Sequence, residues 1–128
     1  MNVRRWRPPL VWAGVIIFLT SIPNPPVPRA LAASDKLAHF GMYFGFGFLL
    51  ARAVLQEASP MFTILATVAV GAIIGAVDEW HQQFIPGRSM DSADWRADAV
   101  GVAMGVIVAV AVDAAARRRT IVKPPAKL

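Results

Sequence analysis

Four long apolar segments limit this chain to folds that place helices in a membrane. The segments cover approximately residues 10–22, 37–55, 60–84 and 92–116, and short polar stretches separate them. A helix rises about 1.5 Å per residue, so about 20 apolar residues cross the ~30 Å hydrocarbon layer. The composition agrees, because 56% of the 128 residues are hydrophobic and 16% are charged, whereas soluble domains are about one quarter charged. The sequence predicts an all-α polytopic membrane protein, a compact bundle of four transmembrane helices.

The first apolar segment is the shortest, and two interpretations of it stay open at this point. Leu10–Ile22 follows a basic start and reaches the length of a span only if the preceding residues are counted. The alternative is a signal peptide, which combines a basic start, a short apolar segment and a cleavage motif such as Ala30-Leu31-Ala32. The proline-rich segment Pro23–Pro28 is expected to form an extended loop after the first span.

Capping residues predict the starts of the second and third helices. Ser34 or Asp35 can accept hydrogen bonds from the free N–H groups that begin the second helix. Ser59 followed by Pro60 is the pattern of a capping residue with proline at the first helical position. The fourth helix is expected to begin near residue 92 and to stop at residue 116, before the basic run Arg117–Arg119.

The distribution of lysine and arginine predicts the orientation of the chain. The two tails and Arg52 hold nine of the 13 basic residues, and the other two loops hold Arg29, Lys36, Arg88 and Arg96. Because cytoplasmic segments carry the excess of basic residues, both termini are predicted to lie in the cytoplasm. We therefore divide the chain into a basic tail (residues 1–9), a membrane domain (residues 10–116) and a second basic tail (residues 117–128).

Composition also excludes several classes of function. The chain has no cysteine, so it can form no disulfide and offers no thiol nucleophile. The formal net charge is +5, but the basic residues gather beside the spans, where they typically contact anionic lipid. No basic patch with interleaved aromatic residues is present, so nucleic acid is not an expected partner.

Three pairs of glycines at four-residue spacing predict close helix packing. Such pairs let helix backbones approach one another in lipid. We expect them to act within the chain, and an oligomer formed through the same faces is the alternative. The pairs are Gly41 and Gly45, Gly71 and Gly75, and Gly101 and Gly105.

Ionisable residues from three predicted spans are expected to lie at the same depth in the membrane. With span centres near residues 46, 71 and 104, His39 lies roughly 10 Å above the midplane, Asp78 and Glu79 roughly 10–12 Å, and Asp98 roughly 9 Å. Charged groups at such depths face the interior of a bundle rather than lipid. Residues 35 to 98 hold six acids on this side against Lys36, Arg88 and Arg96, so not every carboxylate is expected to stay ionised.

The same residues form a pattern that resembles the VanZ-like family over most of the chain. The pattern is Asp35-Lys36-x-x-His39-Phe40-x-x-Tyr43, Asp78-Glu79-x-x-Gln82-x-Phe84-x-Pro86-Gly87-Arg88 and Asp94-x-x-Ala97-Asp98-x-x-Gly101. The position of Asp98 is typically Asn in this family, so Asp98 adds a charge. The resemblance implies a small multi-span protein of the bacterial cytoplasmic (inner) membrane, associated with resistance to glycopeptides, especially teicoplanin. It also implies a retained first span, and it brings no established reaction or catalytic residues.

Three hypotheses follow for the polar residues. In the first, the cluster binds an envelope component, such as a lipid-linked precursor, through Asp35, Lys36, Tyr43, Gln82, Asp91, Asp94 and Asp98. In the second, an enzyme uses Glu79 or Asp78 as general base, His39 as its acid/base partner and Arg88 to hold an anion. In the third, the charged residues only form ion pairs that fix the helix ends.

Metal binding and transport are not expected from the sequence. Neither H-x-x-x-H nor an equivalent spacing of metal ligands occurs, so we predict no metal and no cofactor. A transporter would need an ionisable group near the midplane, where the predicted spans are uncharged. The partner that the sequence predicts most directly is the lipid bilayer.

Overall fold

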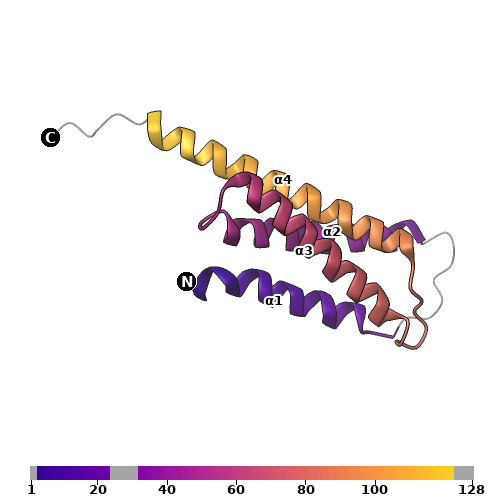
Figure 1. Ribbon diagram of the computed structural model, residues 1–128. Helices are drawn as coiled ribbons and strands as arrows, with labels where there is room; N and C mark the ends of the chain where they lie inside the picture. Colours follow the sequence, from indigo (N-terminus) through magenta and orange to yellow (C-terminus); the bar gives the residue numbers. More distant parts are fainter. Residues whose placement is uncertain (1–2, 24–31, 123–128) are drawn as a thin grey trace.

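The computed structural model describes residues 3–23 and 32–122 of the chain (Figure 1). These residues form four helices and parts of the segments that connect them. The helices are α1 (Val3–Thr20), α2 (Ala32–Val54), α3 (Pro60–Gln82) and α4 (Ser92–Val122). The all-α prediction is therefore confirmed. The extended loop predicted for Pro23–Pro28 lies almost entirely outside the described residues, as does most of the cleavage motif at residues 30–32.

The capping signal at Ser59 located the start of α3, whereas α2 begins at Ala32, before the predicted capping residues Ser34 and Asp35. The outer limits of the bundle also differ from the prediction. Ser59 caps α3, with its hydroxyl accepting the N–H of Phe62 at 3.3 Å, and α4 begins at Ser92. In contrast, α1 begins seven residues before the apolar segment. Similarly, α4 runs through Arg117–Arg119, because arginine is a good helix former and does not end a helix by itself.

Three of the helices are long and apolar enough to cross a membrane. The candidate spans are Ser34–Val54, Pro60–Gln82 and Ser92–Thr120. In comparison, α1 has 18 residues and carries three arginines, at positions 4, 5 and 7. The structure thus supports three candidate spans and one shorter helix, which is fewer than the four predicted spans.

Glycines hold α2 and α4 together along the largest interface in the bundle. A Cβ atom on Gly101 would lie 2.5 Å from the carbonyl oxygen of Phe40, and one on Gly105 would clash with that of Phe44. On α3, Gly71 packs against the side chain of Val102 of α4, which would lie 2.5 Å from a Cβ on Gly71. These contacts confirm the predicted packing within the chain for Gly71, Gly101 and Gly105, whereas nothing lies within 4 Å of a Cβ on Gly41.

Polar and apolar side chains are distributed as expected for a protein surrounded by lipid. The buried face of α3 carries Thr63, Thr67, Asp78, Glu79 and Gln82, while its outer face exposes large apolar residues such as Leu65, Ile73 and Val77. Burying apolar surface gives no advantage in lipid, so small and polar residues collect between the helices.

Contacts at several heights fasten α1 to the other helices, although its interface with α3 is the smallest in the bundle. Figure 1 shows α1 set off to one side of the other three helices. Near its start, Arg5 pairs with Glu57 at 3.1 Å. In its middle, the indole N–H of Trp12 donates to the carbonyl oxygen of Met42 at 2.8 Å. This arrangement leaves space between α1 and α3.

Candidate functional site

A polar cluster lies at one end of the bundle, where α1 and α3 end and α2 and α4 begin. The helix order places the positive ends of the α2 and α4 dipoles here, and Asp35 and Asp94 sit in those first turns, where carboxylates are favoured. We use the name polar cluster for Thr20, Asp35, Lys36, His39, Tyr43, Asp78, Glu79, Gln82, Arg88, Asp91, Asp94 and Asp98.

His39 occupies the centre of the polar cluster between two carboxylates. Its Nδ1 lies 3.0 Å from Asp98 Oδ1 and 3.8 Å from Glu79 Oε1. The three residues come from α2, α4 and α3, and each is at most 2% exposed. The equal depth that the sequence predicted for them thus corresponds to direct contact between three helices.

Asp78 joins three helices through hydrogen bonds from two hydroxyl groups. Thr20 of α1 donates to Asp78 Oδ1 at 2.7 Å, and Tyr43 of α2 donates to Oδ2 at 3.1 Å. The sequence analysis did not single out Thr20. Its position as a hydroxyl residue near the end of the apolar segment 10–22 is the signal that could have found it.

Lys36 fixes the start of α4. Its ammonium group lies 2.8 Å from Asp94 Oδ1 and 3.1 Å from Asp91 Oδ2. The N–H of Ala93 and the neighbouring Lys36 hold the pKa of the Asp91 carboxyl below its usual value. In turn, the backbone N–H of Asp91 donates to Glu79 Oε2 at 2.9 Å, which ties the loop before α4 to α3.

Arg88 binds protein oxygens rather than pointing freely inward. Its Nε donates to the carbonyl oxygen of Ile22 at 3.0 Å, and its Nη1 donates to Gln82 Oε1 at 3.1 Å. A longer contact of 3.5 Å joins Nη2 to the carbonyl of Leu19. Gln82 in turn donates to Glu79 Oε1 at 3.3 Å. Arg88 therefore links the end of α1 to the centre of the polar cluster.

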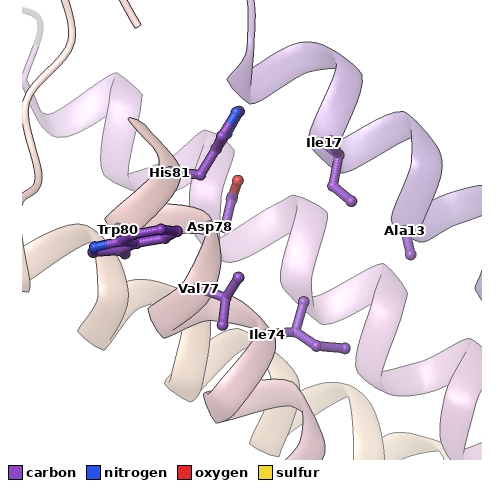
Figure 2. A pocket seen from close by; sticks show the side chains of 7 residues that line it. All are labelled: Ala13, Ile17, Ile74, Val77, Asp78, Trp80 and His81. Carbon is purple, nitrogen blue, oxygen red and sulfur yellow. The ribbon is translucent and has the colours of Figure 1, made fainter. Parts of the chain in front are cut away.

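Two cavities border the cluster. The smaller has a volume of about 190 Å³ and is lined by Leu19, Thr20, Asp35, Ala38, His39, Met42 and Arg88. The larger, about 430 Å³, lies between α1 and α3 and is almost wholly apolar; Figure 2 shows Ala13 and Ile17 of α1 across from the α3 side chains. Its polar groups are those of Asp78 and His81, together with the indole of Trp80.

The structure thus brings nearly all of the candidate residues together at this end of the bundle. Hydrogen bonds and ion pairs connect most of them, while Asp78 and Tyr43 form a separate hydrogen-bonded group with Thr20. Asp35 lies beside them in the wall of the smaller cavity. Arg96 is separate, because its side chain is exposed and donates to the carbonyl of Ser92 on its own helix.

In a comparison with protein families, the family model described as VanZ/LLP1 matches residues 6–113. These residues include α2, α3 and most of α1 and α4. No curated protein and no solved structure matches the chain.

Proposed function

Since the chain belongs to the VanZ/LLP1 family, we propose that it binds a lipid-linked component of the bacterial cell envelope. In this proposal the chain crosses the cytoplasmic membrane four times, with both termini inside. Its polar cluster then lies at the outer surface, and occupancy of the site lowers susceptibility to glycopeptides such as teicoplanin.

The observation that carries this proposal is the apolar cavity between α1 and α3. Its volume of about 430 Å³ lies within the range of about 300–1,000 Å³ that small-ligand sites occupy. The wall is formed by residues such as Ile17, Ile74 and Val77, and Asp78 and His81 lie at its polar end. A hydrocarbon chain suits such a wall, and a polar head group would meet the cluster beside it.

Two features of α1 support its role as the fourth span. Leu10, Val11 and Phe18 are each about two thirds exposed, which suits contact with lipid. At the far end of the helix, Thr20 reaches the buried carboxylate of Asp78, so α1 belongs to the bundle over its full length. The arginines at its start then fit a cytoplasmic interface.

The purely structural hypothesis explains only part of the polar cluster. Lys36 with Asp94 and Asp91 does form an ion-paired helix start. However, His39, Glu79 and Asp98 are buried together at membrane depth, where ionisable groups are costly and are usually retained for function. Ion pairing alone therefore does not account for the centre of the cluster.

Binding to a lipid-linked precursor tests the proposal. We would place the purified protein in nanodiscs of defined phospholipids and titrate a polyprenyl-diphosphate lipid. Val77→Trp fills the cavity from a position that is already 56% exposed, so it should weaken binding about tenfold, ~1.4 kcal/mol. Leu65→Trp, on the exposed face of the same helix away from the cavity, is the matched control. Equal binding by both variants, or no preference over bulk phospholipid, would contradict the proposal.

A second candidate function is supported by His39 itself. It borders the smaller cavity and has two carboxylates beside it, which is a set of groups that can transfer protons. A membrane enzyme acting on the same lipid is therefore the alternative to simple binding. Chemical conversion of the bound lipid that His39→Gln abolishes, with binding retained, would favour the enzyme.

A further inference from the structure

His39, Glu79 and Asp98 offer three metal-ligand atoms in one place. One ring nitrogen and two carboxylate oxygens lie within 4.8 Å of one another. The distances from His39 Nδ1 are 3.0 Å to Asp98 and 3.8 Å to Glu79. Because the ligands come from three helices, no spacing along the sequence could have indicated this group.

Neither carboxylate of this group has a lysine or arginine as an ion-pair partner among the described residues. The ion pairs of Glu79 and Asp98 are with His39. Asp98 is fully buried, and its Oδ2 has no hydrogen-bond partner. Gly75 packs directly against it, so that a Cβ there would lie 3.4 Å from Oδ2. A buried carboxylate oxygen without a partner is costly, and a cation that binds both oxygens of Asp98 would satisfy Oδ2.

We propose that His39, Glu79 and Asp98 bind a divalent transition-metal ion of the Zn²⁺ type. A tetrahedral ion with bonds of about 2.0 Å places its ligands about 3.3 Å apart, close to the separations that the side chains already have. The imidazole nitrogen favours this class over Mg²⁺ or Ca²⁺, which prefer oxygen ligands. Three protein ligands leave one position for water or an anion.

A second group around His39 is a weaker candidate for the same ion. Asp35, His39 and Asp94 also bring their ligand atoms within 4.8 Å. However, Asp94 already has the ammonium group of Lys36 at 2.8 Å, which competes with a metal. Asp35 instead lines the smaller cavity together with His39, so this cavity provides an access path to the inner group.

The surroundings of Glu79 fit a metal ligand. The N–H of Asp91 binds its Oε2 and the amide of Gln82 binds its Oε1, so both oxygens are oriented before a metal binds. Hydrogen bonds of this kind position carboxylate ligands at metal sites. This inference stands whether or not the proposed lipid binding is correct, because it concerns only the protein's own side chains.

Metal titration of the full-length, untagged protein in nanodiscs tests the proposal. After treatment with a chelator, the wild-type protein should bind about one equivalent of Zn²⁺ by calorimetry. Bound Co²⁺ should show the visible absorption of a tetrahedral ion. Asp98→Asn keeps the shape of the side chain and should weaken Zn²⁺ binding by at least about tenfold, comparable to losses at supporting groups of metal sites.

Asp113→Asn is the control, because Asp113 pairs with Arg117 outside the polar cluster. Its affinity for Zn²⁺ should equal that of the wild type. Failure of the wild type to bind Zn²⁺, Co²⁺ or Mn²⁺ would overturn the proposal. Equal affinities of Asp98→Asn and the wild type would overturn it as well, since the bound ion would then lie elsewhere. The Co²⁺ spectrum of the wild type gives a result that does not depend on the folding of any variant.

Discussion

At the scale of single residues, Asp78 shows how a buried carboxylate can organise a small membrane protein. It lies in α3 and accepts hydrogen bonds from Thr20 in α1 and Tyr43 in α2. Since unsatisfied carboxylate oxygens at this depth are costly, the positions of both hydroxyl groups are coupled to that of Asp78. The hydrogen bonds thus constrain the one helix that packs loosely on α3.

We expect Thr20→Val to loosen α1. The substitution keeps the shape of the side chain but removes the hydrogen bond to Asp78, and interhelical bonds in membrane proteins contribute about 0.6 kcal/mol, up to roughly 1.7 kcal/mol. A fall in unfolding free energy of about 1 kcal/mol in detergent is the expected result.

Thr120→Val provides the comparison for that measurement. Thr120 is exposed, and its hydroxyl bonds only to the carbonyl of Ala116 on its own helix. Its stability should stay within about 0.5 kcal/mol of the wild type, as for most surface substitutions. If the two variants lost equal stability, the contact between Thr20 and Asp78 would have no specific role.

At the scale of helices, the interface between α2 and α4 depends on glycine. A Cβ on Gly105 would meet the Phe44 carbonyl and lie 2.8 Å from the backbone nitrogen of Phe48. Because backbone atoms cannot move aside as a flexible side chain can, Gly105→Ala should push the helices apart. We expect a loss of about 1–3 kcal/mol, the usual cost of overpacking.

Gly41→Ala is the matched control, and we expect it to raise the stability rather than lower it. Nothing lies within 4 Å of a Cβ at that position, and alanine favours a helix over glycine by roughly 0.5–1 kcal/mol. Unfolding of both variants by SDS or heat gives the comparison. A Gly105→Ala protein as stable as Gly41→Ala would show that the close packing of α2 and α4 is not needed.

The limits of prediction from sequence are also clearest for individual helices. Ser59 marked the start of α3 because capping is a local interaction. Depth counted along three helices predicted that His39, Glu79 and Asp98 lie at one level, and the structure shows that His39 contacts the other two. The bounds of α1 were missed, because an apolar segment indicates what contacts lipid and not where helical hydrogen bonds begin.

Interactions that depend on the placement of α1 could not be predicted in the same way. The partner of Thr20 and the carbonyl partners of Arg88 are set by how α1 docks, and the sequence contains no periodic signal for that docking. The sequence analysis assigned Arg88 to anion binding, whereas the structure shows its guanidinium group bonded to protein oxygens. Its role with an anion stays a prediction.

At the scale of the whole molecule, the predicted orientation can be tested because the chain contains no cysteine. Gln56→Cys and Ser89→Cys place single thiols in exposed loops at opposite ends of the bundle. With both termini in the cytoplasm, a membrane-impermeant maleimide should label Ser89→Cys in intact spheroplasts. Gln56→Cys should react only after permeabilisation. The reverse labelling pattern would contradict the orientation and place the polar cluster on the cytoplasmic side.

The attachment of Arg88 to α1 has a consequence for how the sequence can vary. Its guanidinium group binds the main-chain oxygens of Leu19 and Ile22, which every amino acid carries. The side chains of Leu19 and Ile22 are exposed, so other apolar residues can replace them without loss of this attachment. Mutational tolerance should therefore be high at these two positions and low at Arg88, even though all three take part in the same contact.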